Sequence, residues 1–164
     1  MERKTPIYQK SHVNYSELLQ PAKGWSDFIF YRTIIWRLLS KYRLECCKEA
    51  LEDAQIMYDA GRYKNALNRA YYAIFHGMRA VNALKGFDSS KHSGVIAFFN
   101  QNYVKLGVFP KEASKIIKLA SEKRERADYL DFYVASKEEA EEQIKRAKLF
   151  TEWIENYLKA FGIR

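Results

Sequence analysis

Cysteine, glycine, proline and histidine are all scarce in this 164-residue chain, which has two, seven, three and three of them. So few turn-forming residues leave little material for the many tight turns of an all-β fold. The two cysteines, Cys46 and Cys47, are adjacent, so they form neither a CxxC pair nor a disulfide framework, and we expect a reducing, cytoplasmic location. The three histidines share no metal-ligand spacing, so we expect no metal and no cofactor.

Long hydrophobic runs are also missing. No apolar run reaches the roughly 18 residues that a transmembrane helix needs, because Arg32 and Arg37 interrupt the richest window, residues 28–39. The N-terminus does not have the basic-then-apolar order of a signal peptide. Glycine-rich phosphate loops and the GxSxG and Cys/His nucleophile arrangements are absent too. We therefore expect no membrane association and none of the common catalytic motifs.

What the chain does have is an excess of positive charge and many aromatic residues. Its 28 Lys and Arg outnumber 20 Asp and Glu, which gives a formal net charge of +8. This balance fits contact with nucleic acid, and it equally fits charge that serves solubility alone. A hydrophobic content of 48% with 15% aromatic residues is typical of a globular protein, and the length predicts one domain with a sizeable core.

Apolar residues recur at helical spacing through most of the chain. The pattern predicts helices from about residue 27 or 40 to 60, over 65–85, from Ser90 or Ser93 to 103, over 110–127 and over 136–161. A loop follows residue 127, and Ser136 and Glu139 have the spacing of a capping box. We expect an all-α, up-and-down bundle of four long helices plus one short helix over residues 39–164. Residues 1–38 form an N-terminal extension, either an aromatic docking arm or a passive tail.

The helix predicted over residues 65–85 has two different faces. One face is apolar and consists of Leu67, Ala70, Tyr71, Ile74, Met78 and Val81. The opposite face has Arg69, Tyr72, His76 and Arg79 at spacings of three and four residues. An arginine can bind a phosphate through two hydrogen bonds while a neutral histidine moves a proton, which is the minimum for metal-free RNA cleavage. The alternative is an interface stripe, and we expect a homodimer with this face at or beside its two-fold axis.

The segment NRAYYAIFH at residues 68–76 closely resembles the SRAYYAxFH signature of small prokaryotic HEPN-domain proteins. Other strings agree with that family in order and spacing: residues 61–63, 91–96, 126–129, 131–133 and 136–140. The resemblance covers roughly residues 42–158 and implies a HEPN-like helical bundle. Fold does not imply function, so the functional residues need their own argument.

The resemblance places a second candidate site near the end of the helix predicted over residues 110–127. Many HEPN ribonucleases have an arginine and a histidine with four to six residues between them, and this motif faces its copy across a dimer. Here Tyr129 stands in the histidine position counted from Arg124, and Asp131 stands there counted from Arg126. The candidate catalytic residues are Arg124, Arg126, Asp128, Tyr129, Tyr133, Arg69 and His76. The candidate phosphate-binding residues are Arg69, Arg79, Lys123, Arg124 and Arg126. The alternative is a structural loop held by Arg–Asp pairs and packed aromatic side chains.

Three functions are consistent with these features. The resemblance implies a toxin-like partner of a small nucleotidyltransferase, acting on or binding RNA or nucleotides. In some relatives the nucleotidyltransferase neutralises its partner by adenylylating a tyrosine near the arginine motif. The second function is a metal-independent endoribonuclease that uses Arg69, His76 and the 124–133 stretch. The third is a non-catalytic helical module that binds nucleotides or RNA.

Overall fold

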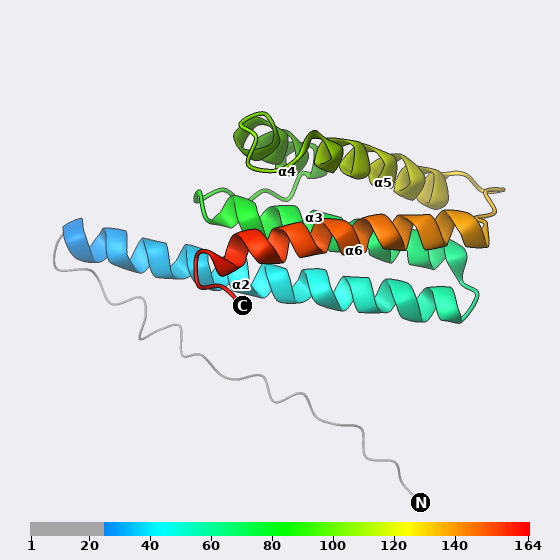
Figure 1. Ribbon diagram of the computed structural model, residues 1–164, viewed down its shortest axis with the longest axis horizontal. Helices are drawn as coiled ribbons and strands as arrows, with labels where there is room; N and C mark the ends of the chain where they lie inside the picture. Colours follow the sequence, from blue (N-terminus) through cyan, green and yellow to red (C-terminus); the bar gives the residue numbers. More distant parts are fainter. Residues whose placement is uncertain (1–24) are drawn as a thin grey trace, which may run out of the picture. The chain divides into compact units, whose positions relative to one another are not determined.

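The computed structural model describes residues 25–164, and in this range the chain is helical with no strand (Figure 1). The long helices are α2 Trp25–Asp59, α3 Tyr63–Ala83, α5 Lys111–Tyr129 and α6 Lys137–Lys159. The short helix is α4 His92–Phe99, which continues into one π-helical turn, η1 Asn100–Val104. The predicted all-α architecture with four long helices and one short helix is therefore confirmed.

Residues 35–164 form one compact unit, and everything described below lies within it. The predicted N-terminal extension covers residues 1–38, of which the first 24 lie outside the described residues. Its role as a docking arm or a passive tail therefore stays a prediction. No helix of residues 25–164 combines the length and the apolar composition needed to cross a membrane.

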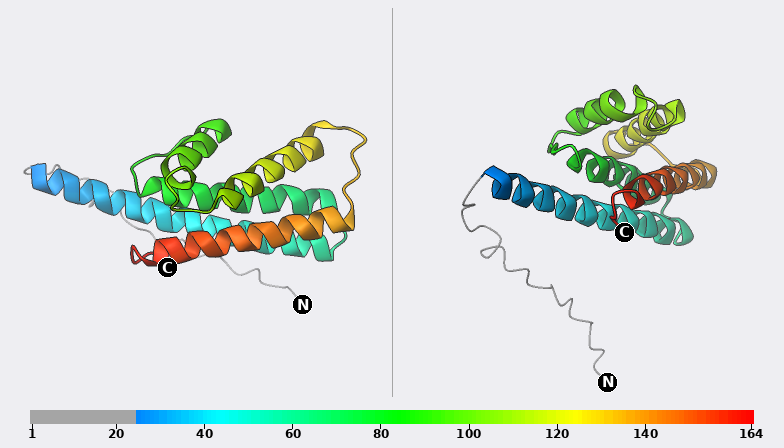
Figure 2. Two further views of the ribbon diagram at one scale, coloured as in Figure 1. Left: turned by 45° about the horizontal axis from the view of Figure 1, so that its top comes forward. Right: turned by 60° about the vertical axis from the view of Figure 1, so that its left-hand side comes forward.

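Helix α3 is the central element of this unit. It contacts α4, α5 and α6, and the two further views show α4 and α5 on one side of it and α6 on another (Figure 2). All six residues of its predicted apolar face are buried, from Leu67 to Val81. Small side chains allow close packing: a Cβ placed on Gly77 would lie 3.2 Å from Ile154 Cγ1 of α6. Because backbone can approach backbone here, α3 can be enclosed by several neighbours at once.

The helix ends confirm one capping prediction and correct another. At the start of α6, Glu139 N donates to Ser136 Oγ at 3.1 Å while Ser136 N donates to Glu139 Oε2 at 3.2 Å, so the capping box is present. The short helix was predicted to begin at a capping serine, Ser90 or Ser93, and this is wrong, because α4 begins after Lys91 with no side-chain cap. Ser89 Oγ instead accepts a hydrogen bond from Lys91 N at 3.1 Å.

Helix α5 extends two residues beyond the predicted end at residue 127 and includes Asp128 and Tyr129. An ion pair stabilises the two added residues, because Asp128 Oδ2 lies 2.7 Å from Arg124 Nε one turn earlier. The same carboxylate accepts a hydrogen bond from Asn68 of α3. Asp128 and Tyr129 are therefore placed by a helix rather than by a loop.

Candidate functional site

The outer face of α3 is half-buried and polar, and other elements contribute to it. Arg69, Tyr72, His76 and Arg79 all have intermediate exposure there. Further charged and polar side chains reach this face from α2, from the start of α4 and from the end of α5. We define the arginine–histidine cluster as Arg43, Arg69, Arg79, Arg124, His76 and His92, together with the carboxylates of Asp88 and Asp128.

One end of the cluster joins α3 to the last turn of α5. Arg69 Nη2 donates to Asn68 Oδ1 at 2.9 Å, and Asn68 Nδ2 donates to Asp128 Oδ1 at 3.1 Å. The carboxylate of Asp128 also pairs with Arg124, whose side chain is 21% exposed. This chain of contacts holds two guanidinium groups close to a single carboxylate, which leaves positive charge in excess.

Aromatic rings lie beside the guanidinium groups of these two arginines. The guanidinium carbon of Arg69 lies 4.9 Å from the centre of the Tyr72 ring. That of Arg124 lies 5.9 Å from the Tyr71 ring centre and 5.8 Å from the Tyr129 ring centre. Such cation–π contacts restrain a guanidinium group without using its N–H donors. The N–H donors that are not used by Asn68 or Asp128 stay available for an anion.

The other end of the cluster is built from α3, α2 and the connection between α3 and α4. Arg79 donates from Nε and Nη2 to the two carboxylate oxygens of Asp88, each at 2.7 Å. Arg43 Nη2 lies 3.5 Å from Asp88 Oδ2. The Arg79 side chain is 14% exposed and that of Arg43 is 17% exposed. Two mostly buried cations therefore share one carboxylate.

The two histidines of the cluster are neutral near pH 7. Burial, followed by the charges of Arg43, Arg79 and Arg69, lowers the pKa of His76 to about 4. Burial and then the charge of Arg124 lower the pKa of His92. A neutral imidazole can accept a proton on one nitrogen and donate a hydrogen bond from the other, so both side chains have the form that proton transfer requires.

Tyr71 and Phe75 of α3 position His92. Tyr71 Oη lies 2.6 Å from His92 Nδ1, and the His92 ring stacks on Phe75 with ring centres 4.2 Å apart. Burial raises the pKa of Tyr71 to about 12, so its hydroxyl group stays protonated. The hydrogen bond and the stacking together fix the orientation of the imidazole.

The remaining predicted site residues lie on a different surface, beside the start of α6. Tyr133 Oη donates to Glu139 Oε2 at 3.1 Å, and Lys123 Nζ donates to the Glu139 carbonyl oxygen at 3.4 Å. The Arg126 guanidinium carbon is 5.3 Å from the Tyr133 ring centre. The predicted set is thus divided: Arg69, His76, Arg79, Arg124, Asp128 and Tyr129 are associated with the cluster, whereas Lys123, Arg126 and Tyr133 are not.

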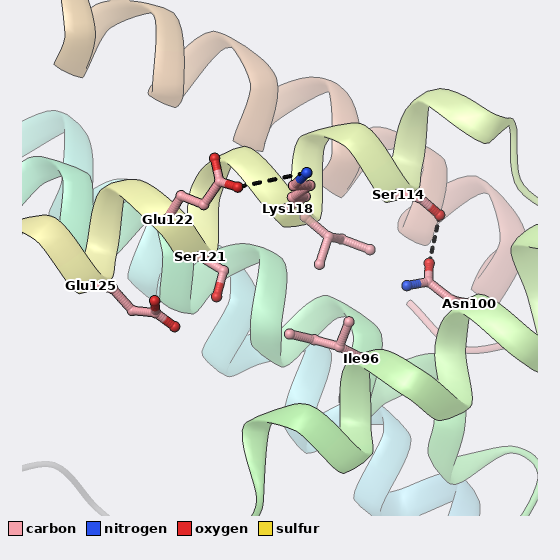
Figure 3. A pocket seen from close by; sticks show the side chains of 8 residues that line it. Ile96, Asn100, Ser114, Lys118, Ser121, Glu122 and Glu125 are labelled. Atoms are coloured by element: carbon pink, nitrogen blue, oxygen red, sulfur yellow. Dashed lines mark hydrogen bonds and ion pairs between the residues drawn. The ribbon is translucent and has the colours of Figure 1, made fainter.

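A cavity of about 470 Å³ opens beside the Arg69 end of the cluster, where Lys64, Asn68 and Asp128 also line it. A second cavity, of about 260 Å³, lies between α4 and α5 (Figure 3). Four of its polar residues form two pairs, since Ser114 Oγ donates to Asn100 Oδ1 at 2.6 Å and Lys118 lies 3.8 Å from Glu122. Of these two cavities, the first is the one lined by an arginine, Arg69.

Sequence reasoning missed four members of this site: Arg43, Asn68, Asp88 and His92. Asn68 and His92 lie in two of the strings that resemble the HEPN family, and that was the available signal for them. Arg43 and Asp88 lie in no such string. Among the described residues, no group of three or more His, Cys, Asp or Glu side chains could hold a metal ion.

By its fold and its site, this protein is an all-α bundle with an arginine–histidine face on its central helix. Comparison with known proteins identifies its family. A model of the HEPN domain matches residues 40–157, so the chain belongs to the HEPN domain family. A UPF0332 protein of Thermotoga maritima is 36% identical over 112 residues, which cover 68% of this chain and 85% of that protein. A Methanocaldococcus jannaschii protein named "Putative toxin" is 35% identical over 116 residues, 71% of this chain and 86% of its own length. A second protein of that name and organism is 30% identical over 115 residues, 70% of this chain and 78% of its own length.

Proposed function

We propose that this chain is a toxin-like HEPN protein that binds RNA or nucleotides through the arginine–histidine cluster. The observation that carries the proposal is the charge of the cluster: four arginines face two carboxylates, and both histidines are neutral. Excess positive charge in a partly buried setting attracts phosphate more strongly than charge on an open surface does. The toxin names of two relatives support the physiological part of the proposal.

Two double variants with the same change in net charge test the site. We expect Arg69→Ala/Arg124→Ala to weaken binding of a short single-stranded RNA by about tenfold or more and to reduce its salt dependence. Lys123→Ala/Arg126→Ala removes two cations from the other surface and should weaken binding far less. Fluorescence anisotropy at several salt concentrations measures both. Equal losses in the two variants would mean that the chain binds RNA by its net charge and not through the cluster.

The proposed partner is a small nucleotidyltransferase that neutralises the toxin by transferring AMP from ATP to a tyrosine hydroxyl group, with release of pyrophosphate and the hydroxyl proton. The contacts favour Tyr129, which is 72% exposed, over Tyr133, whose hydroxyl group donates to Glu139. Induction of the chain alone should arrest growth, and co-expression of a small nucleotidyltransferase that is its partner should relieve the arrest. Tyr129→Phe should escape this relief and lose the added mass, whereas Tyr133→Phe should behave like the wild type. Relief of both variants would exclude Tyr129 as the acceptor.

The predicted homodimer belongs to the same proposal. A two-fold axis at or beside the outer face of α3 would bring two clusters together and double the local positive charge. Sedimentation at tens of micromolar should give the mass of a dimer. A monomer at that concentration would contradict this part of the proposal.

A second candidate is a metal-independent endoribonuclease, which the two neutral histidines favour. In such a reaction the RNA 2′-oxygen bonds to phosphorus, the bond from phosphorus to the 5′-oxygen breaks, and a neutral imidazole accepts the 2′-hydroxyl proton while water protonates the leaving oxygen. Arginines stabilise the charge on the phosphate. Incubation of RNA with the purified chain in EDTA should then give 2′,3′-cyclic phosphate ends, and His76→Gln should remove them. Intact RNA after incubation with the wild type would leave only the binding function.

A further inference from the structure

The Arg79 end of the cluster contains two polar atoms that the fold buries without satisfying. Arg43 Nε and His76 Nδ1 are both buried and have no hydrogen-bond partner among the residues that the structure describes. Among the described residues, Asp88 is the one carboxylate paired with Arg43, and its distance of 3.5 Å is the outer limit of a hydrogen bond. Unsatisfied buried donors are rare in folded proteins, and a mostly buried cation is costly unless its donors are used. These two atoms are therefore open to a hydrogen bond with a group from outside the chain.

The carboxylate of Asp88 shows which kind of group fits. It lies side-on against the Arg79 guanidinium group with two hydrogen bonds of 2.7 Å. Arginine binds carboxylates and phosphates with this same forked geometry. A phosphate has more acceptor oxygens and can have more negative charge than a carboxylate, so it can contact both guanidinium groups at once. The site thus matches phosphate better than it matches the aspartate now in it.

The position of Asp88 allows its side chain to move away from Arg79 while its backbone stays in place. It lies in the non-helical connection between α3 and α4, and its side chain is 28% exposed. The preceding residue, Phe87, stacks on Phe98 of α4 with ring centres 4.0 Å apart, which anchors the connection. Rotation of the Asp88 side chain towards solvent would therefore free the Arg79 fork without unfolding the segment.

We propose that Arg43, His76 and Arg79 form a phosphate-binding subsite, in which a phosphate group of bound RNA or nucleotide replaces the Asp88 carboxylate on Arg79. The proposal rests on the proposed function for the identity of the ligand and adds a phosphate contact apart from Arg69 and Arg124. Asp88 acts as a built-in competitor, so only ligands with enough negative charge occupy the subsite.

The first test uses Asp88→Asn with inorganic phosphate as the probe. Without phosphate, the variant should melt at a lower temperature than the wild type because it loses the paired carboxylate. With phosphate, at ionic strength held constant with chloride, its melting temperature should rise more, and its apparent Kd for phosphate should be about tenfold lower. Asp131→Asn, an exposed aspartate in the connection between α5 and α6, is the matched control and should respond like the wild type.

Arg43→Gln is the second test, and it leaves the Arg79–Asp88 pair in place. This variant should lose the phosphate-dependent rise in melting temperature, whereas Arg146→Gln, which removes an arginine paired with Glu142 on α6, should retain it. If Asp88→Asn does not fold, the comparison of Arg43→Gln with the wild type decides the question alone. An unchanged phosphate response in Arg43→Gln would overturn the proposal.

The source of the phosphate is tested with AMP and with a short RNA. Tighter binding of both by Asp88→Asn assigns the subsite to any phosphate group, and tighter binding of only one assigns it to that ligand. If Asp88→Asn and the wild type respond identically to every probe, Asp88 is a structural partner of Arg79 and the subsite does not exist, whatever happens at Arg69 and Arg124. If Asp88→Asn responds to phosphate while no variant binds RNA or AMP, the subsite stands and the proposed function fails.

Discussion

The two faces of α3 arise from the same helical period but differ in composition and burial. Its inner face is fully buried and made of small and apolar side chains, with Gly77 packed against Ile154 of α6. Its outer face has four half-buried polar residues, and each contacts a charged or aromatic group of its surroundings. Van der Waals packing stabilises the first face, and ion pairs and hydrogen bonds organise the second. The difference shows that one helix can separate the residues that stabilise the fold from those available for chemistry.

The largest expected effect comes from filling the inner face. Gly77→Leu cannot be accommodated, because even a Cβ there would lie 3.2 Å from Ile154 and 3.4 Å from Phe150. We expect the free energy of unfolding to fall by about 2–4 kcal/mol. Urea denaturation followed by circular dichroism measures it. Gly77→Ala is the control, because it needs a shift of only a few tenths of an ångström, and it should cost much less. Equal losses for both variants would show that helix conformation, and not packing, decides this position.

A smaller effect is expected on the outer face, through protonation of His76. The pKa of His76 is lowered from 6.5 to about 4 in the folded chain, so between these pH values the unfolded chain binds the proton and the folded chain does not. The free energy of unfolding should therefore fall as the pH is lowered from about 6.5 to 4, by about 1–2 kcal/mol after allowing for solvent screening. Denaturation curves at several pH values measure this slope.

His76→Gln removes the titrating group and provides the control for that slope. Its stability should depend less on pH over the same range, with His92 and the carboxylates contributing what remains. Arg43, Arg69 and Arg79 all face His76, so protonation there adds charge to an already positive group. A slope that is the same in His76→Gln and in the wild type would place the pH dependence elsewhere.

The smallest effect is expected at a helix end away from both faces. Ser136→Ala removes one side of the capping box of α6 and should lower the free energy of unfolding by about 1 kcal/mol. It should leave RNA binding unchanged, which gives a reference for stability loss without loss of the outer face. Ser93→Ala is the matched control: Ser93 is exposed and caps no helix, so its change should stay within about 0.5 kcal/mol.

Interactions between residues that are close in sequence account for the features of the fold that could be predicted. The buried face of α3 follows from a repeat of 3.6 residues per turn, and the capping box follows from two side chains three residues apart. The turn at Gly61 has a φ of 71°, a conformation that favours glycine, and it ends α2 where the sequence predicted an end. Each of these features depends on residues within one or two turns of one another, so the sequence alone contains it.

The arrangement of the candidate site was only partly predictable. Arg69, His76 and Arg79 share a face because of their spacing along one helix. Arg124 and Arg126 were predicted to act together near a loop, but α5 continues to Tyr129, and residues two apart on a helix point to different sides. Arg124 therefore faces α3, and Arg126 faces Tyr133. Both arginines lie within the helix as predicted to residue 127, so their spacing of two residues already implied this division.

The sequence by itself determined the helical fold, the family and the polar outer face of α3, because these depend on composition, periodicity and short strings. Only the tertiary structure decided which side chains complete the cluster. Arg43 lies in α2, Asp88 in the connection between α3 and α4, and His92 at the start of α4, and packing brings all three to the outer face of α3. Contacts between separate elements depend on the relative placement of whole helices, which no local pattern specifies.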